Sequence, residues 1–113
     1  MISCIRGKLF IAVVDLNQES RSLGKWCSVI LNRPSQMLYV PDDCAVGSFA
    51  MKQTDFICMF GENSFISGYD SGIIWNDKEI AIDWPKGVKN VILSEKDRNW
   101  PTFKEIRKEL EQI

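Results

Sequence analysis

The chain has 113 residues, of which 45% are hydrophobic, so it can form one globular core and is too short for two ordinary domains. Its 14 Lys and Arg against 15 Asp and Glu give a formal net charge of -1, which leaves no broad basic surface for a nucleic acid. No apolar run approaches the roughly 20 residues of a membrane-spanning helix, and residues 1–6 hold no long apolar signal segment. We therefore expect a cytoplasmic protein that contacts neither nucleic acid nor membrane.

Most of the chain predicts short β-strands. Residues 8–15 are apolar at nearly every position, which indicates a central strand covered on both faces. Clusters of Asn, Asp, Pro and Gly then separate further runs that are rich in β-branched and aromatic residues, at the even spacing of all-β folds. These runs predict strands over residues 26–31, 36–40, 46–51, 55–60, 72–75 and 79–82.

The C-terminal segment predicts one short helix. Thr102 and Glu105 have the spacing of a capping box just after Pro101, and apolar residues then recur at helical spacing. We expect the apolar stripe to pack on the sheet and the charged residues of the helix to lie in solvent. No repeat or linker divides the chain, so residues 1–113 are predicted to form a single domain. The stripe consists of Phe103, Ile106, Leu110 and Ile113.

The cysteines give no sign of a metal or redox centre. Cys4, Cys27, Cys44 and Cys58 are widely spaced and include no Cys-x-x-Cys pair, so we expect small, reduced and mostly buried thiols. The chain contains no histidine, so a metal site would need thiolates or carboxylates that converge from distant positions. We predict no metal and no cofactor.

A series of short motifs runs along nearly the whole chain. Any one of them is weak, but their order and spacing are specific together. They are Arg6-Gly7-Lys8-Leu9-Phe10, Val13-Val14-Asp15-Leu16, Gly24-Lys25-Trp26, Leu38-Tyr39-Val40-Pro41, Ser71-Gly72-Ile73-Ile74-Trp75-Asn76-Asp77, Ile82-Asp83-Trp84-Pro85 and Leu93-Ser94-Glu95-Lys96-Asp97. In this order they resemble the dTDP-4-dehydrorhamnose 3,5-epimerase family. The resemblance implies an all-β, cupin-like jelly-roll β-sandwich with one short C-terminal α-helix, and a homodimer.

The resemblance also implies a chemistry. Members of the family epimerise C3 and C5 of a dTDP-4-keto-6-deoxy sugar: a base removes the proton beside the ketone, the enolate is stabilised, and a proton returns on the opposite face. The family uses a His base held by an Asp, a Lys near the developing oxyanion and a Tyr acid. Such a division of roles matches the physics of paired groups whose pKa values lie apart.

Matched residue by residue, this chain departs from that pattern. The family's Asp falls on Asp97, its acid Tyr falls on Cys58, and a further His falls on Val46, while the His base and the Lys belong to a segment upstream of residue 1. Each missing acid or base costs about 10² to 10⁴ in rate. We therefore expect a catalytically inactive relative, a pseudoenzyme, that binds a carbohydrate or nucleotide sugar.

Two alternatives stay open. The chain could be an active sugar epimerase in which Asp97 or Cys58 transfers the proton, against the structural interpretation of Asp97 as a turn residue and of Cys58 as part of the core. It could instead be a structural module whose exposed sheet face pairs with another copy. The candidate ligand-binding residues are Trp26, Tyr39 and Trp75, which could stack on a ring, and Lys8, which could meet a diphosphate.

Overall fold

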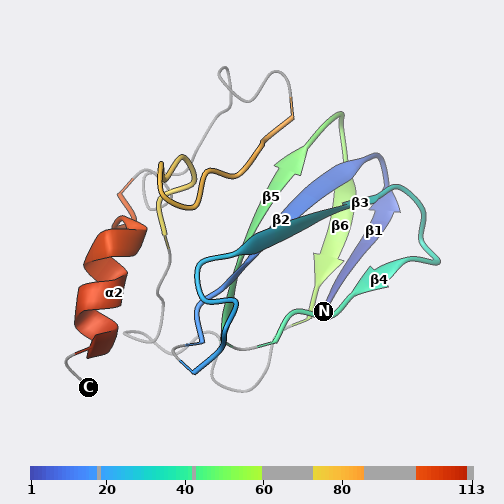
Figure 1. The fold of residues 1–113 in the computed structure, drawn as a ribbon. Coiled ribbons are helices and arrows are strands. Elements are labelled where there is room, and N and C mark those ends of the chain that lie inside the picture. Colours follow the sequence, from blue (N-terminus) through green and yellow to red (C-terminus); the bar gives the residue numbers. More distant parts are fainter. Residues whose placement is uncertain (18, 42, 60–72, 86–98, 112–113) are drawn as a thin grey trace.

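The structure is a computed structural model that describes residues 1–17, 19–41, 43–59, 73–85 and 99–111. Two three-stranded antiparallel sheets, ordered β4-β1-β6 and β3-β2-β5, face each other, and a helix lies at the C-terminal end of the chain (Figure 1). The elements are β1 (Ile2–Arg6), β2 (Leu9–Asp15), β3 (Trp26–Leu31), β4 (Met37–Leu38), β5 (Cys44–Ala50), β6 (Asp55–Cys58) and α2 (Phe103–Glu111).

The main core lies between the two sheets. Leu9 and Ile11 of β2 point toward β1, where Ile2 and Cys4 meet them, and Leu31 of β3 completes the cluster. Successive strand residues point to opposite faces, so the continuous apolar run in β2 covers both of its sides. The prediction that this run forms a central strand is confirmed, because β2 pairs with both β3 and β5.

A second core covers the outer face of the β3-β2-β5 sheet. Val14 of β2 clusters there with Ile80 and Phe103, the first residue of α2. The ring of Trp84 lies 5.5 Å from the ring of Phe10, which also points to this face. Residues 73–85 and α2 therefore lie on one side of this sheet, and the β4-β1-β6 sheet lies on the other (Figure 1).

The predicted helix is confirmed together with its cap. The Thr102 hydroxyl accepts the N–H of Glu105 at 3.3 Å, and the Thr102 carbonyl accepts the N–H of Ile106. Lys104, Glu105 and Lys108 are exposed, as expected for the solvated side of an amphipathic helix. At nine residues α2 is far too short to cross a bilayer, and the described part of the chain has no helix that could.

Two of the predicted strands are wrong and one strand was missed. Residues 79–82 form no strand: residues 79 and 80 lie in a turn, because the Asp77 carboxylate accepts the N–H groups of Glu79 and Ile80 and so competes with strand pairing. Residues 73–75 form no strand either, and Gly72 lies outside the described residues. The missed strand is β1, whose Ser3 and Cys4 interrupt the apolar pattern that the other strands show.

Ala81 adopts a left-handed backbone with a φ of 57°, which costs an L-residue about 1 kcal/mol or more. We expect Ala81→Gly to raise the free energy of unfolding by about 1 kcal/mol, because glycine adopts this conformation without a Cβ clash. Urea unfolding followed by circular dichroism measures the change. The matched control is Ala50→Gly in β5, which should lower stability by about 0.5 to 1 kcal/mol, and a loss of stability in both variants would contradict the prediction.

Candidate functional site

The β3-β2-β5 sheet leaves part of its inner face accessible beside the core. Residues directly opposite each other on neighbouring strands point to the same face, so the partners of inward-facing Ile11 and Val13 also point inward. These partners are exposed, although they face the other sheet. Ile11 lies opposite Val29 and Ser48, and Val13 lies opposite Cys27 and Val46.

Strand β6 adds two side chains from the facing sheet. Cys58 lies opposite Ile2, and Phe56 lies opposite Cys4, so both point inward. Cys58 is half-buried and packs against the edge of the core cluster, whereas the Phe56 ring is 44% exposed. The accessible inward-facing side chains are called the inner-face site below. They are Cys27, Val29, Val46, Ser48, Phe56 and Cys58.

The inner-face site has a restricted chemistry. Its six side chains are three apolar groups, two thiols and one hydroxyl, with no carboxylate, imidazole or ammonium group among them. Such a surface can pack against the apolar side of a ring and can exchange a hydrogen bond through Ser48. It supplies no group that is ready to act as a base near neutral pH.

Asp15, at the end of β2, lies on the same face of the sheet as Ile11 and Val13. Its carboxylate accepts hydrogen bonds from the hydroxyls of Ser20, at 2.6 Å, and Ser22, and from the N–H of Asn17. The two serine hydrogen bonds, followed by that of Asn17, hold the pKa of Asp15 below its usual value. A carboxylate held ionised in this way acts as a hydrogen-bond acceptor and is a poor proton donor.

The thiols are more accessible than the sequence suggested. Only Cys4 is buried, whereas Cys27 is exposed and Cys44 and Cys58 are half-buried, so the expectation of mostly buried thiols is wrong. The strand register explains the difference, because the three accessible cysteines lie on strands that flank the central pair β1 and β2. All four are free. Burial, followed by the charges of Asp43 and Asp15, raises the pKa of the Cys44 thiol.

Two of the predicted stacking residues lie on the other side of the β3-β2-β5 sheet from Cys58. Trp26 lies opposite Val14 and packs against the outer core around Ile80 and Phe103. Trp75 makes an edge contact with Trp84 at 6.3 Å between ring centroids, and its carbonyl accepts the indole N–H of Trp84 at 2.8 Å. The structure therefore does not bring these two rings together with the inner-face site.

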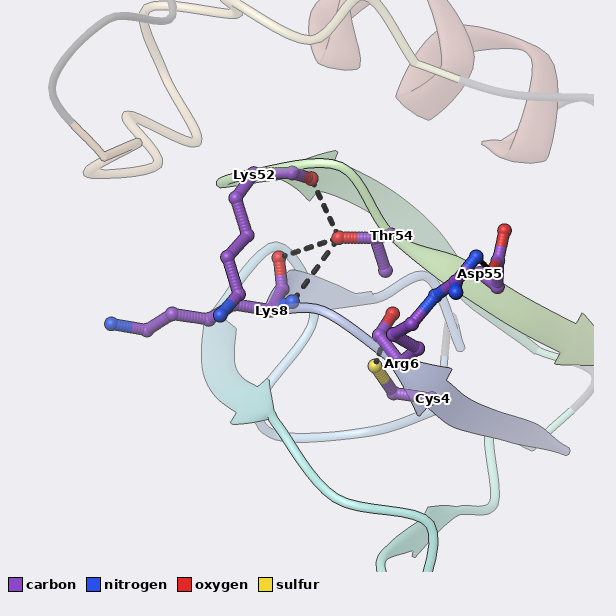
Figure 2. A network of polar contacts seen from close by, with 6 residues as sticks. All are labelled: Cys4, Arg6, Lys8, Lys52, Thr54 and Asp55. Carbon is purple, nitrogen blue, oxygen red and sulfur yellow. Dashed lines mark hydrogen bonds and ion pairs between the residues drawn. The ribbon is translucent and has the colours of Figure 1, made fainter.

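The other predicted residues lie elsewhere. Tyr39 is 69% exposed just after β4. Lys8 lies in the turn between β1 and β2, where its N–H is donated to the Thr54 hydroxyl at 3.1 Å and its side chain extends away from the Arg6 to Asp55 ion pair (Figure 2). Asp97 lies outside the described residues. Cys58 is thus the one predicted site residue that the structure places on the inner face.

Sequence reasoning missed most of this site. Val46 was noted only as the position of a family histidine, and Cys27, Val29, Ser48 and Phe56 were not predicted as site residues. Their chemistry gives no signal, because apolar and thiol side chains on strands usually form core. The register of strand pairing would identify them as inward-facing, but the register is known only once the partner of each strand is known.

Two facing antiparallel sheets, between which the chain passes repeatedly, with accessible side chains on their inner faces, define a cupin-like jelly-roll β-sandwich. Residues 1–105 match the family model of dTDP-4-dehydrorhamnose 3,5-epimerase, and the chain belongs to this family.

Individual relatives agree with this assignment. The dTDP-4-dehydrorhamnose 3,5-epimerase of Methanothermobacter thermautotrophicus is 36% identical over 107 residues, which cover 93% of this chain and 58% of the relative. The Legionella pneumophila dTDP-6-deoxy-D-glucose-3,5-epimerase, in complex with dTDP-4-keto-L-rhamnose, superposes with a TM-score of 0.77 at 29% identity, over 96% of this chain and 58% of that protein.

The Bacillus anthracis dTDP-4-dehydrorhamnose 3,5-epimerase, with TDP and PPi bound, has a TM-score of 0.74 at 31% identity, over 90% of this chain and 58% of that protein. The chain therefore spans a little over half the length of the relatives it matches.

Proposed function

We propose that this chain binds a nucleotide sugar at the inner-face site and does not epimerise it. The observation that carries the proposal is the position of Cys58 and Val46. By the resemblance, these residues fall on the positions of the family's acid Tyr and of one family His, and the strand register puts them on the facing inner surfaces of opposite sheets. In our proposal, a binding surface is thus retained at the positions where the acid Tyr and one His of the family are replaced.

The ligand class follows from the relatives and from the chemistry of the site. One related structure holds TDP and PPi, and another holds dTDP-4-keto-L-rhamnose. An uncharged, largely apolar surface with one hydroxyl suits the neutral ring of a deoxy sugar or a base better than a diphosphate. Tyr39 and Lys8 remain candidate contacts for the rest of such a ligand, whereas Trp26 and Trp75 lie on the outer side of the β3-β2-β5 sheet.

The absence of turnover follows from the groups that proton transfer needs. Inversion beside a ketone needs a base on one face of the sugar and an acid on the other, with the enolate oxygen stabilised. By the resemblance, Cys58 stands at the position of the family's acid Tyr, and valine at position 46, the position of a family His, can neither take nor give a proton. Each lost group costs about 10² to 10⁴ in rate.

Ligand titration tests the binding. We expect dTDP and dTDP-sugars at millimolar concentration to shift the NMR signals of Val46, Ser48 and Cys58 and to slow alkylation of the Cys27 thiol. Val46→Trp should fill the site and weaken binding at least about tenfold. The matched control is Ile30→Trp on the outer face of β3, which should bind as the wild type does. Unchanged signals at these three residues would refute binding at this site.

Hydrogen exchange tests the catalytic alternative. In D₂O, dTDP-4-keto-6-deoxyglucose incubated with the protein should gain no deuterium at C3 or C5 beyond the buffer control. Incorporation that disappears in Cys58→Ser or Asp97→Asn would instead identify the residue that transfers the proton. That outcome would show that the chain is an active epimerase and would contradict our proposal that it does not epimerise the sugar. The proposed ligand binding would be unaffected.

We further propose that the protein is a cytoplasmic homodimer. The family resemblance supports a dimer, and the outer face of the β4-β1-β6 sheet exposes large apolar side chains that favour association. Sedimentation velocity over a concentration series measures the assembly state. A monomer at the highest concentration would exclude the dimer.

A further inference from the structure

Three turns meet at one end of the sandwich, away from α2 (Figure 1). They join β1 to β2, β3 to β4 and β5 to β6. Leu9, just after the first turn, lies opposite Leu31, just before the second, and opposite Ala50, just before the third. The side chains in and beside these turns include four cations and one anion, although the chain as a whole has a net charge of -1. We call this group the cationic end, and it consists of Arg6, Lys8, Arg33, Lys52 and Asp55.

The backbone of the cationic end is fixed by one hydroxyl. Thr54 accepts the N–H of Lys8 at 3.1 Å, and its own hydrogen can be donated to the carbonyl of Lys8 or of Lys52, at 3.2 and 2.7 Å (Figure 2). The Lys8 carbonyl also accepts the N–H of Met51 at 2.9 Å. Gly7 has a φ of 105°, and a Cβ there would lie 2.5 Å from the Thr54 hydroxyl, so no larger residue fits this corner. The backbones of Lys8 and Lys52 are therefore held next to each other.

Three of the four cations have no anionic partner in the part of the chain that the structure describes. Arg6 is paired with Asp55, but no carboxylate of the described residues forms an ion pair with the other three. The Arg33 and Lys52 side chains are exposed, and Lys8 is half-buried. Because the backbones of Lys8 and Lys52 are held together, their like charges repel each other, and a bound anion would remove this repulsion.

We propose that the cationic end is a docking surface for a short acidic segment of a partner protein. Charge complementarity defines the class of partner, since three cations without a partner carboxylate can each meet a carboxylate of the segment. The rest of the chain has a net negative charge, which would repel a long polyanion such as a nucleic acid. A short segment contacts the cations alone.

Two features favour the carboxylates of a peptide over a phosphate group. Phosphate sites commonly add backbone N–H donors, but those of Lys8 and Met51 are already donated within the cationic end. The remaining donors are side-chain cations that belong to three different turns. Such donors suit several carboxylates spaced along an extended segment better than one compact phosphate.

The cationic end is separate from the inner-face site. Leu9 and Leu31 face inward at this end of the sheet and are 1% and 2% exposed, so packed core lies between the two surfaces. Docking at this end therefore goes beyond nucleotide-sugar binding and does not depend on it. Lys8 is also a candidate contact for the nucleotide sugar, so the test uses Arg33 and Lys52.

Fluorescence anisotropy with a labelled oligoglutamate peptide tests the docking surface. We expect the wild type to bind this peptide with an affinity that falls as salt is added, and Lys52→Glu to weaken binding about tenfold. Arg33→Glu, in the turn after β3, should act in the same way and is available if Lys52→Glu fails to fold. The matched control is Lys104→Glu, which makes the same change of charge at an exposed lysine of α2 and should bind as the wild type does.

The outcomes separate this surface from its alternatives, with circular dichroism as the check on folding. No binding of oligoglutamate by the wild type, or equal weakening by Lys104→Glu, would overturn the docking surface. Tighter binding of tripolyphosphate or duplex DNA than of oligoglutamate, also weakened by Lys52→Glu, would overturn the acidic segment as the occupant. Displacement of the peptide by dTDP would overturn a surface separate from the nucleotide-sugar site. Weakening by Lys52→Glu or Arg33→Glu, with Lys104→Glu and dTDP binding unchanged, supports it.

Discussion

Replacing Asp77 with alanine should lower the free energy of unfolding by about 3 to 5 kcal/mol. The Asp77 side chain is buried, and its two oxygens accept three backbone N–H groups: those of Glu79 and Ile80 at 2.9 Å and that of Phe103 at 2.8 Å. Alanine would remove this acceptor, and the loss of the two buried hydrogen bonds, those of Ile80 and Phe103, should cost about 1 to 3 kcal/mol each. Because Phe103 begins α2, the substitution should loosen both the turn at residues 77–80 and the start of the helix.

Urea unfolding measures this effect, and two variants separate its causes. Asp77→Asn keeps one acceptor oxygen and should cost about half as much as Asp77→Ala. Asp83→Ala removes an exposed carboxylate from the same segment and should change stability by less than about 0.5 kcal/mol. An Asp77→Ala variant within about 1 kcal/mol of the wild type would show that these hydrogen bonds do not hold α2 on the sheet.

Much of the sandwich could be predicted from local pattern. The apolar run of β2 is long and bounded by a glycine and an asparagine, so both its type and its limits follow from residues 7–17. β3 was predicted with its observed limits, Trp26–Leu31, because β-branched and aromatic residues end abruptly at Asn32-Arg33-Pro34. The helix was predicted because its apolar stripe and its N-terminal capping box both indicate a helix that begins after Thr102. In each case the local sequence preference and the tertiary packing favour the same structure.

The turn at residues 77–80 could not be predicted in this way. Residues 79–82 have strand-like composition, but the Asp77 carbonyl accepts the N–H group of Ala81, and the buried Asp77 carboxylate accepts those of Glu79 and Ile80. That acceptor is effective because Phe103, far along the chain, fixes its second oxygen. The determining contact is therefore tertiary, and no short window of sequence contains it.

The location of the site could not be predicted for a related reason. Both faces of β3 carry apolar or small residues, so its sequence does not show whether Trp26 or Cys27 points toward the other sheet. Pairing decides this: Trp26 lies opposite Val14 and Cys27 lies opposite Val13. One step of register separates a half-buried outer aromatic from an accessible inner thiol. A prediction of stacking residues from aromatic content alone cannot make that distinction.

Ile11→Ala and Val46→Ala should have very different effects on stability, although both residues lie on the same inner face. Ile11 is fully buried in the core between the sheets, so its truncation should cost about 3 to 4 kcal/mol through lost burial and the cavity left behind. Val46 on β5 is 48% exposed, so Val46→Ala should cost less than about 1 kcal/mol. Urea unfolding of both variants, with Ile30→Ala as the exposed control on the outer face, makes the comparison. If Val46→Ala cost as much as Ile11→Ala, the inner face would be packed at Val46 and would have no room there for a sugar ring. A small cost, together with weaker dTDP binding by Val46→Trp, would mean that this face is kept open for a ligand at the expense of the core.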